Sequence, residues 1–236
     1  MSGKVTLEWH EATSSNILAD NLADWVAERL GAALSERGTA FLAVSGGTTP
    51  KLFFQALSKR DLDWSKVVVT LIDERFVDHT SPRSNQGLAQ ANLMQNEASA
   101  ARFLPLYNGA NDPDEGARLA EEALAGAPWP LDVAVLGMGT DGHTASLFPD
   151  APNLDELLDP NGPRKVDAVH AVSAGEPRLT LTLPAIVSAH SLVLHIEGVG
   201  KRHALERALA ERDGRRKPIA SVVDQARQVE VFWTAG

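Results

Sequence analysis

The sequence contains no cysteine, and its basic residues are outnumbered by acidic ones, 22 to 31. Without cysteine the chain has no disulfide, no thiolate metal site and no cysteine nucleophile. The formal net charge of −9 argues against a nucleic-acid partner, because a phosphate backbone requires a basic face. An anionic small molecule would need a local basic pocket to overcome the repulsive field of the whole chain.

Long apolar runs are also missing. The chain has no stretch of about 18 consecutive apolar residues, so we expect no membrane-spanning helix and no membrane partner. The first ten residues lack the apolar core of a signal peptide, and a cytoplasmic location is the default expectation. The rest of the composition is ordinary for a globular protein, with 44% hydrophobic and 22% charged residues in a chain of 236.

Short apolar runs alternate with helical patterns along the chain. Apolar and β-branched composition predicts strands over residues 39–44, 67–72, 131–136, 179–183, 192–196 and 229–233. Apolar spacing and capping signals predict helices over residues 18–30, 50–57, 86–94, 112–124 and 201–210. This alternation predicts an α/β fold with a mostly parallel sheet and helices on both faces.

Three further expectations concern the organisation of the chain. No repeat or strong linker divides it, so a single domain over residues 1–236 is expected. Residues 150–170 are rich in Pro, Asp, Asn and Gly and are interpreted as an irregular surface segment. Ser14 or Ser15 is expected to cap the first helix, and Asn85 the third.

A glycine-rich segment follows the strand predicted at 131–136. It reads Gly-Met-Gly-Thr-Asp-Gly-His and places three glycines, Asp141 and His143 within seven residues. Glycine lets the backbone turn sharply and approach a ligand closely. Loops just beyond strand ends are where open α/β sheets bind small molecules. We interpret this loop as a candidate active-site segment; the alternative is a tight turn with a solvated histidine.

A second glycine-bearing loop, Ser45-Gly46-Gly47-Thr48-Thr-Pro, joins the strand predicted at 39–44 to a helix. Free backbone N–H groups at a helix start favour an anion, and the hydroxyl side chains add donors. The Gly-Lys-Ser/Thr ending of a Walker loop is absent. An anion-binding loop and a plain strand–helix turn are the two interpretations.

Charged residues near other strand ends complete the candidate set. Asp73 and Arg75 follow the strand predicted at 67–72, and Arg75 can fork onto a phosphate or carboxylate, unless the segment is a surface salt-bridge cluster. Arg178 precedes another predicted strand. Lys201 opens a predicted helix, where a cation is not favoured, so either an anionic ligand or simple solvation accounts for it. No spaced His and carboxylate ligand set suggests a metal.

Together these segments resemble the signatures of the 6-phosphogluconolactonase family. The match runs in order through residues 44–50, 73–77 with 84–88, 137–149, 178–184 and 198–201, and spans about residues 40–225. The resemblance implies a Rossmann-like fold, no cofactor and no metal requirement. It also implies hydrolysis of 6-phospho-D-glucono-1,5-lactone to 6-phosphogluconate, the second step of the oxidative pentose phosphate pathway.

The resemblance also implies roles for particular residues. His143 is the expected general base that activates water, since an ordinary imidazole titrates near pH ~6.5. Asp141 is expected to orient it or to touch a sugar hydroxyl. The expected substrate-binding residues are Ser45, Gly46, Gly47, Thr48, Asp73, Arg75, Gly139, Arg178 and Lys201. It stays open which of Arg75, Arg178 and Lys201 contacts the phosphate. It also stays open whether N–H groups of the glycine loops or Arg75 stabilise the oxyanion.

Two alternatives belong to the same superfamily or reuse its fold. Glucosamine-6-phosphate deaminases typically carry Asn-Glu where this chain has Leu147-Phe148, so a carboxylate needed for ring opening is missing. A non-catalytic sugar-phosphate sensor would carry a DNA-binding helix-turn-helix. The roughly 38 residues before the first predicted strand are too few and too acidic for that module.

Overall fold

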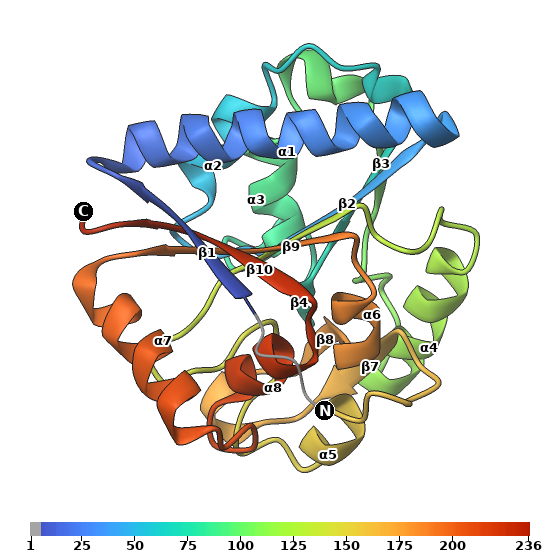
Figure 1. The fold of residues 1–236 in the computed structure, drawn as a ribbon. Helices are drawn as coiled ribbons and strands as arrows, with labels where there is room; N and C mark the ends of the chain where they lie inside the picture. Colours follow the sequence, from blue (N-terminus) through green and yellow to red (C-terminus); the bar gives the residue numbers. More distant parts are fainter. Residues whose placement is uncertain (1–5) are drawn as a thin grey trace.

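The computed structural model describes residues 6–236 and shows a central parallel sheet flanked by helices (Figure 1). Seven strands, all paired in parallel, follow the order β1-β10-β9-β6-β2-β3-β5. Their bounds are β1 Thr6–Ala12, β2 Ala40–Val44, β3 Val67–Leu71, β5 Arg102–Leu104, β6 Val133–Leu136, β9 Ser191–Glu197 and β10 Gln228–Thr234. Residues 1–5, part of the stretch in which no signal peptide was expected, lie outside the described residues.

Helices cover both faces of this sheet. In Figure 1 the long helix α1 crosses on one side, with α2 and α3, while α7 and α8 lie on the other. The helices are α1 Ser15–Arg37, α2 Lys51–Leu57, α3 Asn85–Asn92, α4 Pro113–Leu124, α5 Leu154–Leu157, α6 Leu183–Val187, α7 Val199–Glu211 and α8 Pro218–Gln225. The predicted fold, a Rossmann-like α/β architecture with a mostly parallel sheet, is confirmed. Within residues 6–236 no helix has the length and apolar character needed to cross a bilayer.

The central strands are buried along their whole length. Every residue of β2, β3 and β6 is buried, because helices pack on both faces of the sheet. Strands in that position have continuous apolar sequences rather than alternating ones. The apolar runs predicted at 39–44, 67–72 and 131–136 therefore match β2, β3 and β6 closely.

Helix α1 begins and ends at two local signals in the sequence. The Ser14 side chain accepts a hydrogen bond from the Ile17 N–H, and Gly38 adopts a left-handed φ of 73° after the last turn. Such caps satisfy backbone groups that a helix end leaves unpaired. Of the two serines expected to cap this helix, Ser14 does so.

A smaller antiparallel sheet stands beyond the end of β3. Its strands are β4 Asp73–Arg75, β8 Arg178–Leu181 and β7 Val166–Val169, in the order β4-β8-β7. The Leu181 N–H donates to the Ile72 carbonyl at 2.8 Å, which joins this sheet to the main one. The small sheet therefore forms a wall at the carboxyl edge of the main sheet.

Two sequence expectations about segments were wrong. Residues 150–170 are not irregular throughout, since they contain α5 and β7, and β7 forms because it pairs with β8 across the small sheet. Helix α3 is capped by Ser84, whose Oγ accepts the Gly87 N–H at 3.1 Å. Asn85 instead turns its amide to the Asp73 carbonyl, donating at 2.8 Å.

Candidate active site

Four loops meet because the strands that precede them are neighbours. Strands β9, β6, β2 and β3 lie side by side, and their carboxyl ends share one edge of the parallel sheet. Strands β2 and β6 are neighbours in the middle of the sheet. The next strand of the sheet along the chain lies on one side for β2, which is followed by β3, and on the opposite side for β6, which is followed by β9. Such a switch point opens a crevice in α/β sheets, where small molecules bind.

A cavity of about 200 Å³ occupies this position. Among its lining residues are His143 and eight of the nine residues expected to bind substrate: Ser45, Gly46, Gly47, Thr48, Asp73, Arg75, Gly139 and Lys201. Asp141 and Arg178 do not line it. The structure therefore brings together segments that are as much as 156 residues apart in sequence, from position 45 to position 201.

The loop after β6 holds a histidine–carboxylate pair. His143 Nδ1 lies 2.7 Å from Asp141 Oδ1, and the same oxygen accepts the His143 backbone N–H at 3.2 Å. One carboxylate thus fixes both the backbone and the ring of His143. The Phe148 ring packs against the imidazole, with the centroids 4.6 Å apart. Nε2 is left as the ring nitrogen available for chemistry in the cavity.

The start of α8 supports this loop from behind. Gly142 adopts a left-handed φ of 89°, and its carbonyl accepts the Ile219 N–H at 3.1 Å. Lys217 Nζ donates to the Asp141 carbonyl at 2.9 Å. Ala145, which lines the cavity, also has a positive φ of 52°. A non-glycine residue in that region stores strain, which is common at binding and catalytic sites.

Gly139 has no room for a side chain. A Cβ there would lie 2.4 Å from His143 Nδ1 and 2.4 Å from Asp141 Oδ1. At Gly126, which does not line the cavity, a Cβ would have no atom within 4 Å. The two glycines therefore offer a matched pair of substitutions.

We expect Gly139→Ala to lower turnover roughly tenfold, within the ~10²-fold cost of displacing a catalytic group by ~1 Å. The added methyl group must push the His143 ring away from its present position. Gly126→Ala, as the control away from the cavity, should retain nearly full activity. Steady-state kinetics on both variants, with circular dichroism to confirm folding, test this, and equal activities would contradict the packing argument.

The loop after β2 packs tightly against its neighbours. Ser45 N–H donates to the Val135 carbonyl at 2.9 Å, and Ser45 Oγ accepts the Gly137 N–H at 3.3 Å. A Cβ on Gly46 would lie 1.9 Å from Asn85 Oδ1, so only glycine fits beneath that amide. Gly47 has a φ of 97°. The backbone of this loop is therefore held in a fixed shape at the cavity wall.

Two cations line the cavity without an ion-pair partner in the described part of the chain, Arg75 and Lys201. Arg75 Nη1 donates to the Arg83 carbonyl at 2.6 Å, which fixes the guanidinium without neutralising it. Burial lowers the pKa of Lys201, and the Glu197 carboxylate opposes that shift. Unpaired cations beside a cavity in an acidic chain indicate a site for an anion.

Arg178 lies outside the cavity and pairs with Arg75 across the small sheet. It is only 7% exposed, donates to the Glu176 and Ala174 carbonyls, and forms an ion pair with Glu176 at 3.3 Å. Burial, followed by repulsion from Arg75, lowers the pKa of Arg178. Arg178 therefore places no donor inside the cavity, and its charge is balanced by Glu176.

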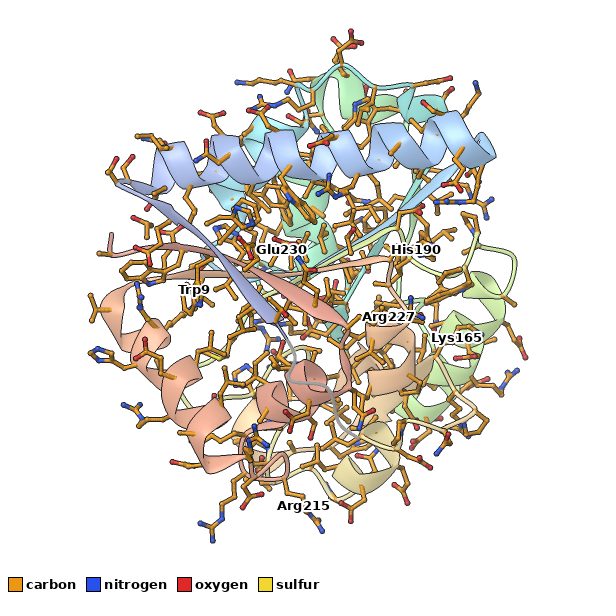
Figure 2. The ribbon with its side chains drawn as sticks, in the orientation of Figure 1. Trp9, Lys165, His190, Arg215, Arg227 and Glu230 are labelled. Atoms are coloured by element: carbon orange, nitrogen blue, oxygen red, sulfur yellow. The ribbon has the colours of Figure 1, made fainter. Side chains whose placement is uncertain are left out.

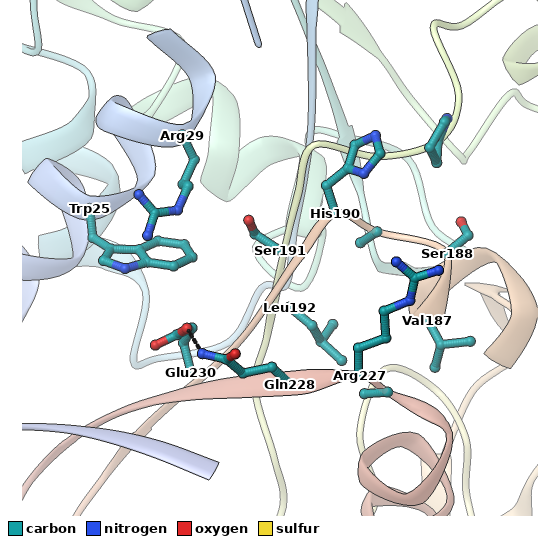
Figure 3. A pocket seen from close by; sticks show the side chains of 13 residues that line it. Trp25, Arg29, Val187, Ser188, His190, Ser191, Leu192, Arg227, Gln228 and Glu230 are labelled. Atoms are coloured by element: carbon teal, nitrogen blue, oxygen red, sulfur yellow. Dashed lines mark hydrogen bonds between the residues drawn. The ribbon is translucent and has the colours of Figure 1, made fainter. Parts of the chain in front are cut away.

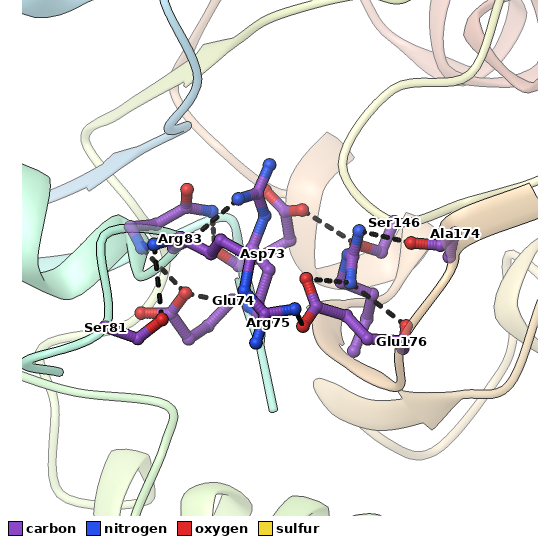
Figure 4. Close-up of polar contacts among 10 residues, drawn as sticks. Asp73, Glu74, Arg75, Ser81, Arg83, Ser146, Ala174 and Glu176 are labelled. Atoms are coloured by element: carbon purple, nitrogen blue, oxygen red, sulfur yellow. Dashed lines mark hydrogen bonds and ion pairs between the residues drawn. The ribbon is translucent and has the colours of Figure 1, made fainter. Parts of the chain in front are cut away.

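Sequence reasoning missed Glu74, which is completely buried between Asp73 and Arg75 (Figure 4). Its carboxylate accepts the Asn85 and Gln86 N–H groups and the Ser84 hydroxyl at 2.7 to 2.9 Å, as well as the Arg75 N–H. Burial raises the pKa of Glu74, and these hydrogen bonds oppose the shift. The contacts tie β4 to the start of α3 and so position Arg75 and Asn85.

Five lining residues were absent from the expected set: Thr49, Asn85, Gly137, Met138 and Ala145. Asn85 was interpreted as a helix cap, and the signal that could have corrected this is Ser84, a second good capping residue just before it. Asp73, which was expected, lines the cavity and accepts the Ser146 hydroxyl at 2.7 Å. Ala145 carries no sequence signal, because its role lies in its backbone conformation.

A larger cavity, about 590 Å³, lies elsewhere and holds none of the expected residues. Figure 3 shows Trp25 and Arg29 of α1 facing residues at the amino ends of β9 and β10. Glu230 is bonded to Gln228, and the Arg29 guanidinium covers the Trp25 ring at 4.4 Å. Figure 2 shows where His190, Arg227 and Glu230, three residues that line this larger cavity, lie in the whole molecule. Ligands of parallel sheets bind at carboxyl ends, so the smaller cavity is the better candidate.

No group of three or more His, Asp or Glu side chains within residues 6–236 is arranged to hold a metal ion. The absence of a metal requirement and of a nucleic-acid partner stay predictions from the sequence.

The fold and the cavity define a Rossmann-like protein with a small-molecule site at the carboxyl edge of its sheet. The sequence model of the family described as glucosamine-6-phosphate isomerases/6-phosphogluconolactonase matches residues 13–233. The chain belongs to this family, which confirms the resemblance inferred from its motifs.

Individual relatives agree. The chain is 58% identical over 226 residues to a 6-phosphogluconolactonase of Mesorhizobium japonicum, covering 95% of this chain and 94% of that protein. It is 50% identical over 225 residues to one of Rhizobium meliloti, covering 95% and 97%. A crystal structure of a 6-phosphogluconolactonase from Shewanella baltica superposes with a TM-score of 0.94 at 38% identity, covering all of both chains. The expected enzyme class is thereby confirmed at the level of the family.

Proposed function

We propose that this chain hydrolyses 6-phospho-D-glucono-1,5-lactone to 6-phospho-D-gluconate. One observation carries the proposal: His143, Arg75 and Lys201 line the same cavity, so one end of a small phosphorylated molecule can face an imidazole while the other faces two cations that form no ion pair within residues 6–236. The names of the curated relatives support the same reaction.

In this proposal His143 acts as the general base. Its Nδ1 is engaged by Asp141, so Nε2 takes the proton of the attacking water. The water oxygen bonds to the lactone carbonyl carbon, and the carbonyl oxygen becomes an oxyanion. When the oxyanion collapses, the bond from that carbon to the ring oxygen breaks, and the leaving oxygen takes the proton back from the imidazolium. Collapse leaves a carboxylic acid, which releases its proton to solvent to give the gluconate, so the step balances without a cofactor.

Asp141 has the second role, which is to orient the ring. A carboxylate at 2.7 Å from Nδ1 favours the tautomer that carries its proton there, and it stabilises the imidazolium formed during attack. Because Asp141 lies outside the cavity wall, contact with a sugar hydroxyl is the less favoured of the two roles given to it.

The phosphate is assigned to the loop at Ser45–Thr48 together with Arg75 and Lys201. The loop offers hydroxyl and N–H donors, and neither cation is consumed by an ion pair within residues 6–236. Binding at this remote end holds the lactone carbonyl in place for attack. Arg178 is given no direct contact with the phosphate, because it does not line the cavity and its guanidinium is bonded to two backbone carbonyls and paired with Glu176.

A deaminase reaction is disfavoured by the residues beside His143. At the two positions where the resemblance places Asn and Glu in deaminases, this chain has Leu147, with no exposed surface, and Phe148, 7% exposed. The Phe148 ring packs on the imidazole, so this side of His143 is apolar. No carboxylate stands there to assist ring opening.

The test is to follow hydrolysis of freshly prepared phosphorylated lactone by the purified chain, with the spontaneous rate subtracted. Ammonia release from glucosamine 6-phosphate is measured in parallel. Rapid lactone hydrolysis without ammonia release is expected. Ammonia release would favour the deaminase, and binding of 6-phosphogluconate without either reaction would favour a sensor.

A further inference from the structure

Helix α7 carries Lys201 in its first turn, but its own sequence gives that turn little support. Gly198, at the N-cap, has no side chain that could accept a backbone N–H, and Gly200 follows within the turn. Glycine weakens a helix relative to other residues. Lys201 and Arg202 add two positive charges at the helix end where the dipole favours negative ones, and the first turn contains no acidic residue. The position of this turn therefore depends on tertiary contacts.

Strand β10 supplies two of these contacts, both at Gly198. The Gly198 N–H donates to the Thr234 carbonyl at 2.8 Å. The Gly198 carbonyl accepts the indole N–H of Trp233 at 3.1 Å and the Arg202 N–H at 3.4 Å. The second of these bonds begins the helix, and it is longer than the usual range of about 2.7–3.2 Å. The Trp233 indole thus holds the carbonyl on which the first turn of α7 is built.

The Arg202 side chain lies between two tryptophan rings. Its guanidinium carbon is 4.7 Å from the ring centroid of Trp9 and 4.5 Å from that of Trp233, and Figure 2 shows Trp9 beside α7. Glu11 pairs with Trp233 in the parallel register of β1 and β10, and Trp9 stands two residues before Glu11, so these three side chains share one face of the sheet. Arg202 Nη1 also lies 2.8 Å from a Glu11 carboxylate oxygen. Cation–π attraction and an ion pair therefore hold the guanidinium against this face.

The contacts of Arg202 also set the direction of its neighbour Lys201. Successive side chains of an α-helix point about 100° apart around its axis. With Arg202 fixed between the two rings and Gly198 fixed by β10, the first turn of α7 can neither rotate nor shift freely. Lys201 is the residue of this turn that lines the cavity, whereas Arg202 and Trp233 do not line it.

We propose that Trp233 and Arg202 are positioning residues for substrate binding: they fix the first turn of α7 so that Lys201 faces the cavity. The inference rests on the proposed function only where it links Lys201 to the substrate phosphate. The anchoring of α7 by Trp233 can be measured without any reaction.

The first measurement is hydrogen exchange of the α7 backbone, followed by mass spectrometry. Trp233→Phe keeps an aromatic ring beside the guanidinium but removes the N–H that reaches Gly198. Trp129→Phe is the matched control, because the Trp129 indole also donates to a backbone carbonyl, that of Leu124 at the end of α4, at 2.9 Å. In peptides covering residues 198–206 we expect exchange to become about fivefold faster in Trp233→Phe and to stay unchanged in Trp129→Phe. Unchanged exchange in a folded Trp233→Phe variant would refute the anchoring.

The second measurement is kinetic and uses both lactones. Trp233→Phe is expected to raise KM for the phosphorylated lactone about three- to tenfold while kcat changes less than about twofold, because Lys201 is held less precisely and the His143 loop is untouched. KM for unphosphorylated glucono-1,5-lactone should not change, and Trp129→Phe should alter neither value. In a Lys201→Met background, Trp233→Phe should have no further effect on KM, because residues that act together are non-additive. An equal rise in KM in both backgrounds, or with both lactones, would overturn the positioning role.

The two measurements separate this inference from the proposed function. If the wild-type protein has no lactonase activity, the proposed function fails, and the affinity for 6-phosphogluconate replaces KM in the same comparison of variants. Faster exchange in Trp233→Phe together with weaker binding of that anion would then sustain the inference. Rapid lactone hydrolysis with unchanged exchange and unchanged KM in Trp233→Phe would sustain the proposed function and refute the inference.

Arg202→Gln provides a second variant in case Trp233→Phe fails to fold. It removes the stacked cation and leaves the indole hydrogen bond to Gly198 in place. Arg207→Gln removes the same charge from α7 outside the contact with the two rings and is its control. We expect Arg202→Gln, but not Arg207→Gln, to speed α7 exchange and raise KM by smaller factors than Trp233→Phe. If Arg202→Gln folds and matches Arg207→Gln in both measurements, the positioning role is refuted.

Discussion

Replacing His143 by alanine is expected to lower kcat by about 10²–10⁴-fold, the usual contribution of a positioned general base. KM should change little, because the groups assigned to the phosphate lie on other loops. The measurement is the rate of lactone hydrolysis near neutral pH, with the spontaneous reaction subtracted at each substrate concentration. The imidazole is the group in the cavity best suited to take a proton from water at that pH.

Two further variants sharpen this result. His190→Ala removes an exposed imidazole at the larger cavity and should leave turnover unchanged. Asp141→Asn retains the position of the side chain but loses the carboxylate 2.7 Å from Nδ1, so we expect a fall in kcat smaller than that of His143→Ala. A folded His143→Ala variant with near wild-type kcat would refute the general-base assignment. A fall in kcat in His190→Ala would instead place the reaction at the larger cavity.

The sequence predicted the elements of the main sheet best where burial is greatest. Strands β2, β3 and β6 are buried on both faces, so their apolar runs are unbroken and easily recognised. Strand β1 was not predicted because it is an edge strand with alternating partly exposed residues. Strands β4, β5 and β7, of three to four residues, are too short for periodicity to distinguish from loops.

The same limit applies to the candidate site. Glycines and charged residues after strand ends can be recognised in the sequence, and eight of the nine expected binding residues line the cavity. Arg178 has the same local sequence signal but is buried against Glu176 by the pairing of β8 with β4. Glu74 acts through hydrogen bonds with residues 10 to 12 positions away. Such contacts depend on the tertiary fold, and local pattern does not report them.

Arg75→Ala is expected to weaken use of the phosphorylated lactone by about 2–3 kcal/mol in kcat/KM, which is roughly 30- to 150-fold. We choose the lower part of the range of free energies lost when one partner of a buried charge pair is truncated, because Arg75 is partly exposed. The fold should tolerate the change, since Arg75 repels Arg178 across the small sheet. Arg83→Ala removes a neighbouring charge that does not line the cavity and serves as the control.

Comparing the phosphorylated with the unphosphorylated lactone decides whether the fall in kcat/KM of Arg75→Ala comes from a lost contact with the phosphate. Hydrolysis of unphosphorylated glucono-1,5-lactone should be slow in the wild-type protein and nearly unaffected by Arg75→Ala, because no anion reaches the guanidinium. Arg75→Lys should recover part of the loss, since it keeps the charge but not the planar fork that binds two phosphate oxygens at once. If Arg75→Ala reduced hydrolysis of both lactones equally, Arg75 would act at the carbonyl, as the oxyanion donor, and the phosphate would have to be held by Lys201 and the Ser45–Thr48 loop alone.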